Sequence, residues 1–283
     1  MRLYATAIKP GIVLSNTLVA AGSYVFAAST FSLPAFLGLI LGTSCVVASG
    51  CVLNNHFDRE IDAHMTRTAG RGQATGAMTV RGSMLYCALL GLTGIALLVT
   101  LTNLLTALLG LFGWVMYALV YTRAKHRTVH ATLIGTVPGA LPPVAGIAAT
   151  GTGRAMDALL LFLLLVAWQV VHFYAISIRR GADYRAATVP VPAIVYGITR
   201  TKWLMTLGCV LFLTSVVALR VFGSAGVIFT LILGACGIYW LVLAVMGLPK
   251  RSGAVLWARR MFAHSLLVIT ALSAVLFLNP VIP

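Results

Sequence analysis

Acidic side chains are nearly absent from this sequence: Asp and Glu together account for 5 of its 283 residues. Charged residues of both signs make up only 9%, whereas a soluble domain carries about a quarter. Apolar residues make up 60% of the chain. Such a chain has too few polar groups to form a water-facing surface, so a soluble globular fold is excluded.

Alternation of apolar and polar residues is also missing, which excludes a transmembrane β-barrel. The sequence has continuous runs rich in Leu, Val, Ala and Gly instead. These runs reach the roughly 20 residues that a helix needs to cross a bilayer. The sequence therefore predicts an all-α integral membrane protein, with residues 1–283 forming a single membrane-embedded domain.

No stretch is polar enough to form a soluble basic domain, although the formal net charge is +15. Nucleic-acid binding, which requires such a domain, is therefore excluded. The five cysteines include no CxxC pair, and all of them fall inside or at the edge of apolar runs. We interpret them as small buried hydrophobic residues.

Nine hydrophobic segments can be marked along the chain, and the fifth of them is unusual. Six Gly and Pro residues lie between Gly135 and Gly146, so we expect this segment to be kinked or broken. Broken helices at membrane depth normally line a cavity. The segments span about 11–29, 33–53, 84–101, 103–121, 132–150, 157–178, 203–219, 225–247 and 262–280.

Eighteen of the 20 Lys and Arg residues fall in one alternating set of loops, and only Arg154 and Arg220 fall in the other. By the positive-inside rule, the basic set is cytoplasmic. The asymmetry favours nine transmembrane helices with a cytoplasmic amino terminus and a carboxyl terminus on the opposite side of the membrane. The two longest loops, roughly 54–83 and 179–202, belong to the basic set. We therefore expect an active site that opens to the cytoplasmic side.

Three of the five acidic residues, Asp58, Glu60 and Asp62, lie together at the end of the second span. Asn54, Asp58 and Asp62 are spaced i, i+4, i+8, so they share one face if the helix continues. Two carboxylates and an amide oxygen form a set of hard ligands that suits Mg²⁺. Glu60 faces away from this stripe, and we expect it to be a surface ion-pair partner.

Arg59, Arg67 and Arg71 follow within a few turns and are suited to holding phosphate oxygens. Because Mg²⁺ commonly binds through one or two carboxylates plus substrate phosphates, the set predicts a diphosphate site. Beside a hydrophobic cavity, such a site fits an isoprenoid diphosphate that ionises with pyrophosphate as the leaving group. The alternative is that the acids only offset neighbouring arginines at the membrane edge.

The residues of this stripe resemble the first aspartate-rich motif of the UbiA-type intramembrane prenyltransferases. Other stretches resemble the heme O synthase branch of that family, and the match covers nearly the whole chain. The matching residues are Asn54-x-x-x-Asp58-Arg59-x-x-Asp62, Met65-x-Arg67-Thr68-x-x-Arg71, Lys9-Pro10-Gly11, Tyr121-Thr122-Arg123, Lys125-His126-Arg127, Gly139-Ala140-x-Pro142-Pro143, Trp168-Gln169-x-x-His172-Phe173, Asp183-Tyr184-Arg185 and Trp257-Ala258-Arg259.

The resemblance implies nine helices bundled around a central cavity and a Mg²⁺-dependent reaction. In that reaction farnesyl diphosphate alkylates a vinyl group of heme B (protoheme IX), and water supplies a hydroxyl group, giving heme O. The product would then serve a terminal oxidase, either directly or after conversion by heme A synthase. Asn54, Asp58 and Asp62 correspond to the catalytic and Mg²⁺-binding residues.

His172, Arg179 and Asp183 are expected at the heme, because their spacing places them on one helical face and they suit iron and propionate contacts. The alternative for Asp183 is that Gly181 ends the helix before it. Packing is the alternative role for His172. Arg123 and Lys125 are candidates for binding the diphosphate or the propionates, with topology-setting charge as the alternative. Tyr121 is either a heme-contacting cavity residue or part of an interfacial aromatic belt.

The sequence departs from the family pattern in two places. Many relatives have a second aspartate-rich motif after the sixth span, where only Asp183 remains here, and Val171 stands where heme O synthases tend to have Pro. The missing motif argues against the main rival, a UbiA-type enzyme acting on an aromatic acid such as 4-hydroxybenzoate. A transporter is a further alternative, but no second Gly/Pro break pairs with the fifth segment.

Overall fold

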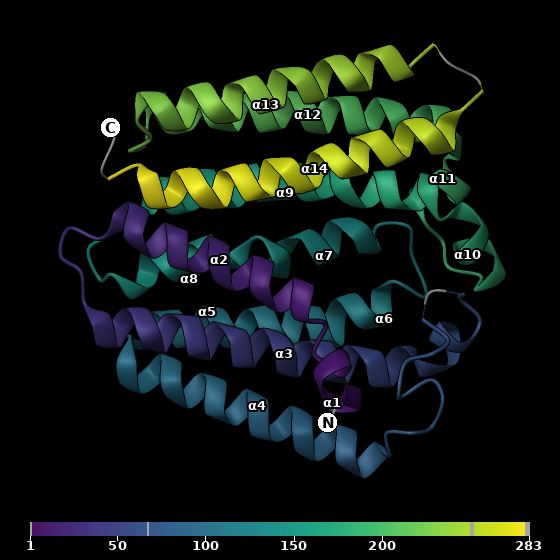
Figure 1. The fold of residues 1–283 in the computed structure, drawn as a ribbon, viewed down its shortest axis with the longest axis horizontal. Coiled ribbons are helices and arrows are strands. Elements are labelled where there is room, and N and C mark those ends of the chain that lie inside the picture. The colour runs from purple at the N-terminus through teal and green to yellow at the C-terminus, as the bar shows by residue number, and fades with distance from the viewer. Residues whose placement is uncertain (1, 67, 250–251, 281–283) are drawn as a thin grey trace.

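The computed structural model describes residues 2–66, 68–249 and 252–280. Within these ranges, nine helical segments are long and apolar enough to cross a membrane, which confirms the predicted number. They lie side by side along the long axis of the molecule (Figure 1). They are α2 (Pro10–Ala27), α3 (Leu33–Ala63), α4 (Val80–Leu101), α5 (Leu104–Val115) with η1 (Met116–Tyr121) and α6 (Thr122–Ala124), α7 (Ala131–Gly139) with α8 (Leu141–Ala149), α9 (Ala155–Arg179), α12 (Gly197–Val221), α13 (Val227–Gly247) and α14 (Ala254–Leu278).

The two ends of the bundle differ in size and charge. The loop after α3, the loop after α6 and the short helices α10 (Gly181–Ala186) and α11 (Pro192–Val195) all gather at the right-hand end in Figure 1. This is the end to which the sequence assigns most of the basic residues. The other end carries Arg154, which donates to the Phe222 carbonyl oxygen. The helix order therefore agrees with the predicted alternation, and which end faces the cytoplasm stays a prediction.

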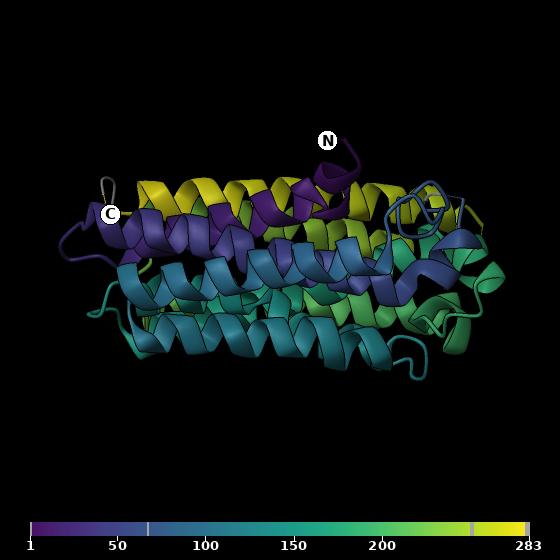
Figure 2. The same ribbon diagram turned by 90° about the horizontal axis from the view of Figure 1, so that it is seen from below.

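The outer faces of the bundle are apolar. On α4, Leu85 is 73% exposed and Leu92 is 74% exposed. Exposed apolar side chains of this kind recur along helices that are long enough to cross a membrane, where lipid tails would cover them, so the chain is a multi-pass membrane protein. The short helix α1 (Arg2–Ala7) stands out from one side of the bundle (Figure 2).

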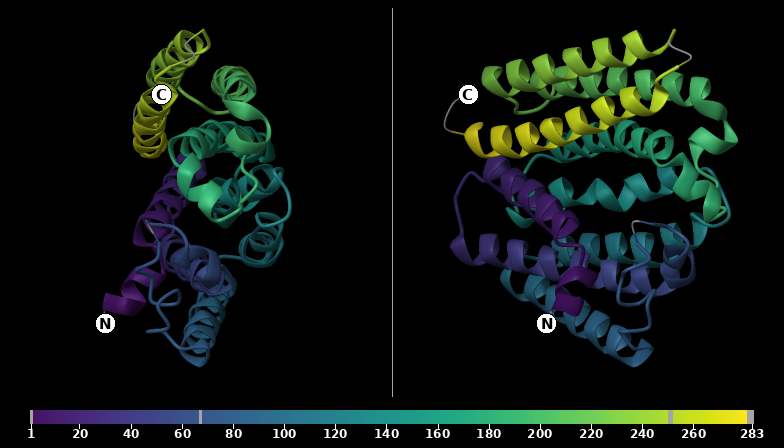
Figure 3. Two further views of the ribbon diagram at one scale, coloured as in Figure 1. Left: turned by 90° about the vertical axis from the view of Figure 1, so that its right-hand side faces the viewer. Right: turned by 45° about the vertical axis from the view of Figure 1, so that its right-hand side comes forward.

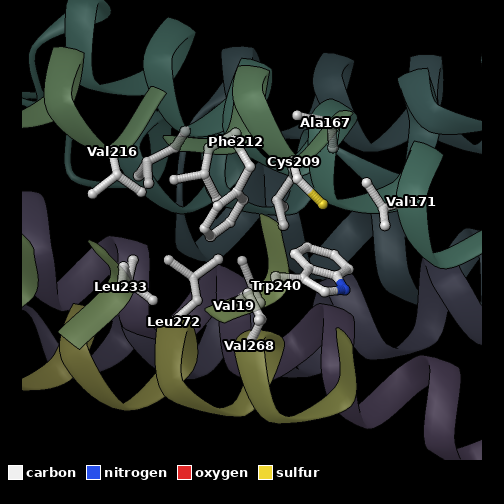
Figure 4. Close-up of a cluster of buried hydrophobic side chains, with 14 of the residues drawn as sticks. Val19, Ala167, Val171, Cys209, Phe212, Val216, Leu233, Trp240, Val268 and Leu272 are labelled. Atoms are coloured by element: carbon white, nitrogen blue, oxygen red, sulfur yellow. The ribbon is translucent and has the colours of Figure 1, made fainter. Parts of the chain in front are cut away.

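A buried apolar cluster holds the helices of the carboxyl-terminal half together. It contains residues of α9, α12, α13 and α14, and Val19 of α2 joins it (Figure 4). Seen from the end of the bundle, α12, α13 and α14 form a group at one side, and α3 and α4 lie at the other (Figure 3). The helices between the two groups, chiefly α2, α7, α8 and α9, enclose the site described below.

The fifth span is broken, as the sequence predicted. Helix α7 ends at Gly139 and α8 begins at Leu141. Pro142 and Pro143 have no N–H group with which to continue the helical ladder, so the turn at Ala140 opens. The amide of Gln169 on α9 donates to the Thr136 carbonyl oxygen at 3.1 Å, which ties the broken segment to the next helix.

The ends of helices α3 and α9 determine which of the candidate polar residues share a helical face. Helix α3 continues ten residues beyond the predicted end at residue 53, to Ala63, so the Asn54–Asp58–Asp62 stripe is helical as proposed. Helix α9 ends at Arg179, and Asp183 belongs to the separate helix α10. The expected continuous helical face that joins His172, Arg179 and Asp183 therefore does not form, because the backbone leaves the helix at Arg180.

Candidate active site

A cavity of about 860 Å³ lies among α2, α3, α5, the broken α7–α8 pair and α9. Its deeper walls are largely apolar, with residues such as Val46, Leu98 and Ile269, and its other end collects acidic and basic groups. A long hydrophobic chamber with one charged end fits a ligand that has an apolar tail and an anionic head.

The acidic stripe lies on the wall of this cavity. Asn54, Asp58 and Asp62 all line it, and all three are buried. Glu60 points the other way, and its side chain is 82% exposed and paired with Arg59 at 3.1 Å. The helical spacing thus brings Asn54, Asp58 and Asp62 together and leaves Glu60, the third acidic residue of this segment, outside the cavity, as the sequence predicted.

Each member of the stripe contacts a different cation. Lys125 donates to Asp58 Oδ2, and Arg71 Nη1 lies 2.6 Å from Asp62 Oδ2. Lys9 Nζ donates to Asn54 Oδ1 at 2.6 Å. The three cations come from three separate segments: the start of the chain, the loop after α3 and the loop after α6. Together they form a positive rim around the oxygen ligands, at the cavity end where an anionic head group would lie.

The donor set fits Mg²⁺. Asp58 Oδ1 lies 3.3 Å from His126 Nε2 without hydrogen-bonding geometry, and has no other partner among the described residues. A buried carboxylate oxygen without a donor is costly, and a cation would satisfy it. The described residues contain no cluster of three or more His, Cys, Asp or Glu residues at metal-binding distance. A metal here would therefore depend on two carboxylates, the Asn54 amide oxygen and ligands from substrate or water, as Mg²⁺ commonly does.

A π-helical segment, η1, forms the cavity wall beside the stripe. The rings of Tyr117 and Tyr121 stack at 5.7 Å with an angle of 12°, and both line the cavity. Thr122 donates to the Tyr117 carbonyl oxygen and accepts a hydrogen bond of 2.9 Å from Asn54 Nδ2. The wider π-helical turn thus connects directly to the stripe, as π-bulges at functional sites often do.

A second group of cavity residues lies on α9. His172 stacks on Trp168 at 4.8 Å, and its Nδ1 lies 2.7 Å from Ser265 Oγ on α14. The guanidinium of Arg179 lies 4.7 Å from the centre of the Phe262 ring. All of these except Ser265 line the cavity. The structure therefore brings His172 and Arg179 into the same chamber as the acidic stripe.

The UbiA prenyltransferase family matches residues 14–278, almost the whole chain. The chain belongs to this family. Among its relatives is the protoheme IX farnesyltransferase of Pseudomonas syringae pv. tomato, which is 41% identical over 95% of this chain and 91% of its own length.

Solved structures share the fold of this UbiA-family chain. Digeranylgeranylglyceryl phosphate synthase superposes with a TM-score of 0.79, covering 98% of both chains at 16% identity. A UbiA homolog from Archaeoglobus fulgidus, bound to DMAPP and Mg²⁺, superposes with a TM-score of 0.74 at 18% identity, covering 97% of this chain and 99% of the other. At these identities the likeness establishes the fold alone.

Several residues that the sequence suggested lie outside the cavity lining of this UbiA-family chain. Arg59 bonds to the His56 carbonyl oxygen and Glu60, and Arg123 lies over the Phe57 ring at 5.7 Å. Both arginines point away because their positions fall on the outer faces of their helices. Asp183 pairs with Arg180 at 3.7 Å. Arg67 lies outside the described residues.

Lys9 is the site residue that sequence reasoning missed as a functional group. It lies in the left-handed region at φ 53°, just before Pro10 opens α2, and this turn directs its amine into the cavity. Burial by the cavity walls lowers the pKa of Lys9 to about 8. The signal was present in Lys9-Pro10-Gly11, but spacing alone does not reveal a contact with a residue 45 positions away.

Proposed function

We propose that this chain transfers the farnesyl group of farnesyl diphosphate to a vinyl group of heme B, with addition of water, and so makes heme O. The observation that carries the proposal is the near full-length match, at 41% identity, to a protoheme IX farnesyltransferase. The whole of residues 1–283 acts as one prenyltransferase domain. The match to protoheme IX farnesyltransferases favours heme over the aromatic-acid alternative, and membership of a prenyltransferase family argues against a transporter.

The charged end of the cavity is the diphosphate site. Asn54, Asp58 and Asp62 would hold Mg²⁺, which supplies Lewis-acid stabilisation of the leaving diphosphate. Lys125 and Arg71 lie against the two carboxylates, and these cations neutralise the negative charge that develops on the diphosphate oxygens. Lys9 completes this positive rim.

The reaction follows from this arrangement. The allylic C–O bond of farnesyl diphosphate breaks, and its electron pair leaves with the diphosphate. The vinyl π electrons of heme B then form a new C–C bond to the farnesyl carbon, which leaves a positive charge on the vinyl carbon next to the porphyrin ring. Water adds to this carbon and loses a proton. The stacked rings of Tyr117 and Tyr121 line the chamber and offer π faces to a transient cation.

The heme lies toward α9 in this proposal. Trp168 and Phe262 offer flat apolar faces to a porphyrin, and Arg179 lies near the charged end, where a propionate would reach it. Tyr121 lines the same chamber and is available to contact the heme. Asp183, paired with Arg180, supports the heme end indirectly by fixing a cavity-lining arginine.

We place the enzyme in a bacterial plasma membrane, with the charged end of the cavity on the cytoplasmic side. The support is the concentration of basic residues at that end of the bundle. Both substrates are amphiphilic and enter from lipid and the membrane surface. The product passes to a terminal oxidase or to heme A synthase.

The decisive experiment is mass analysis of heme extracted after incubation of purified protein with heme B, farnesyl diphosphate and Mg²⁺. We expect a new heme that is heavier by one farnesyl group plus one hydroxyl group. Chelation of Mg²⁺ should abolish the product, and adding Mg²⁺ back should restore it.

A parallel incubation replaces heme B with 4-hydroxybenzoate. Prenylated 4-hydroxybenzoate, together with unchanged heme B in the first incubation, would overturn the proposal in favour of the aromatic-acid reaction. We do not expect prenylated 4-hydroxybenzoate, because the cavity-lining residues His172, Trp168 and Arg179 suit a large aromatic macrocycle.

A further inference from the structure

Two side chains of α9 form hydrogen bonds with Ser265 on α14. Trp168 Nε1 donates to its carbonyl oxygen at 2.8 Å, and His172 Nδ1 lies 2.7 Å from its hydroxyl oxygen. Ser265 itself is fully buried. The two helices are therefore joined at one residue, and both bonded side chains line the cavity on the other side.

The hydroxyl of Ser265 has only one proton, and that proton is already used. Ser265 Oγ donates to the Phe262 carbonyl oxygen at 2.6 Å. The hydroxyl must therefore accept a hydrogen bond from His172, so Nδ1 of the imidazole carries a proton. Among the described residues no carboxylate pairs with His172, which favours the neutral ring. In a neutral ring with a proton on Nδ1, Nε2 holds a free lone pair.

The position of the ring is fixed as well as its tautomer. Trp168 stacks on His172 with an angle of 21°, and the Phe262 ring lies 5.0 Å away. No hydrogen bond to Nε2 occurs within the described part of the chain. Of the described histidines, His172 alone lines the cavity, whereas His264 is bonded to the Cys236 carbonyl oxygen.

We propose that Ser265 is a positioning residue that holds His172 as the Nδ1-protonated tautomer, and that His172 Nε2 is an axial ligand of the substrate heme iron. Imidazole nitrogen is a common protein ligand of heme iron. A ligating histidine almost always donates its other N–H to a fixed acceptor, which Ser265 provides here. Arg179, seven residues further along α9, lies about 10.5 Å along the helix axis, toward the charged end. The proposal rests on the proposed function, because it requires heme as the substrate.

The test is spectroscopy of purified protein loaded with heme B in the absence of farnesyl diphosphate. Resonance Raman spectra of the ferrous form should show an iron–histidine stretching mode in the wild type. His172→Ala should lose the mode, and added imidazole should restore an iron–imidazole mode by filling the vacated space. A melting temperature of the variant equal to that of the wild type in the same detergent would show that the variant is folded.

Ser265 variants separate positioning from simple packing. Ser265→Ala should weaken heme B affinity by about 10- to 100-fold, as removal of such a supporting group typically does, and should shift the iron–histidine mode. Ser265→Thr keeps the hydroxyl and should keep the wild-type mode. Ser273→Ala is the matched control, because Ser273 on the same helix donates only to the Ile269 carbonyl oxygen and does not touch His172. It should leave both affinity and spectrum unchanged.

Two results would overturn the inference. One is a wild-type protein that converts heme B to the farnesylated product but shows no iron–histidine mode, which would leave the proposed function intact. The other is an unchanged mode in His172→Ala, which would assign the ligand to another residue. Failure of the proposed function is a different result: wild-type protein that binds heme B through His172 but never forms a heavier heme with farnesyl diphosphate.

Discussion

Lys9 Nζ lies 2.6 Å from Asn54 Oδ1, so the residue just before the first span reaches the wall formed by the second. The amide nitrogen of Asn54 donates a hydrogen bond to the hydroxyl of Thr122, the first residue of α6. One amide side chain therefore connects the start of the chain, α3 and the end of η1. A substitution at Lys9 should therefore alter the binding of farnesyl diphosphate, although Lys9 lies outside the acidic motif.

Lys9→Met should raise the KM for farnesyl diphosphate by about tenfold, because a charge-assisted hydrogen bond contributes about 1.5–3 kcal/mol. Lys9→Arg keeps the charge and should retain most of the affinity. Steady-state kinetics with varied farnesyl diphosphate provide the measurement. Equal KM values for Lys9→Met and the wild type would remove Lys9 from the site.

Asp58→Asn should lower kcat/KM by at least about 100-fold, which corresponds to about 2.7 kcal/mol of transition-state stabilisation. The reason is that a neutral amide is a poorer Mg²⁺ ligand and no longer pairs with Lys125. Glu60→Gln is the matched control two residues away, since its side chain is exposed and faces away from the cavity. A comparable loss in Glu60→Gln would show that net charge at this helix end matters more than the stripe.

Lys125→Ala and Arg71→Ala should each weaken farnesyl diphosphate binding by about 10- to 100-fold, through loss of a charged contact. Arg59→Ala and Arg123→Ala should bind it normally, because neither arginine lines the cavity. Equilibrium binding of a non-hydrolysable farnesyl diphosphate analogue in the presence of Mg²⁺ compares all four variants. If the two outer arginines matter as much as the inner cations, the diphosphate does not bind inside this cavity.

Sequence patterns predicted the parts of this molecule that depend on periodicity. The nine spans follow from hydrophobicity, and the break at Ala140 follows from the chemistry of Pro142 and Pro143. The stripe of Asn54, Asp58 and Asp62 follows from a spacing of four. Each of these features depends only on residues that are close in the sequence, and so each could be predicted without knowledge of the packing.

Contacts between distant segments could not be predicted in the same way. Arg59 lies between two residues of the stripe and Arg71 follows it, yet only Arg71 contacts a stripe carboxylate, because the loop after α3 turns back on the helix end. The hydrogen bond between His172 and Ser265 joins residues 93 positions apart. The π-helical geometry of η1 also leaves no mark in the hydrophobic pattern. These features depend on packing, which spacing does not encode.

Asp157 stabilises the end of the bundle opposite the charged end of the cavity. It is buried and accepts hydrogen bonds from the backbone and side chain of Ser224, at 2.7 and 2.8 Å. Asp157→Ala should lower the free energy of unfolding by about 1–3 kcal/mol, because buried donors lose their acceptor. Thermal unfolding in detergent measures this loss, and kcat should stay near the wild-type value. Ser29→Ala removes an exposed hydrogen bond at the same end and should change neither.

Gly146 allows α8 to approach α2. A Cβ atom there would lie 2.2 Å from the Ala20 carbonyl oxygen, and backbone cannot easily move aside. Gly146→Ala should therefore destabilise the protein by about 1–3 kcal/mol and push α8 away from α2. Gly234→Ala, on α13, meets no atom within 4 Å and should be neutral or slightly stabilising. The melting temperatures of the two variants are compared in the same detergent. An equal decrease in both would contradict the prediction that Gly146 is needed for close packing of α8 on α2.

The π-helical segment η1 holds one residue more in its turn than an ordinary helix does, because its hydrogen bonds close five residues back. Deleting one residue between Met116 and Tyr121 would let the segment close as an ordinary helix, and the residues on either side would keep nearly the same phase. Lys125 would then still face Asp58, and the loss would fall on the wide turn that carries the stacked rings of Tyr117 and Tyr121. A relative that is one residue shorter here would therefore keep the charged end of the cavity and change the shape of its aromatic wall.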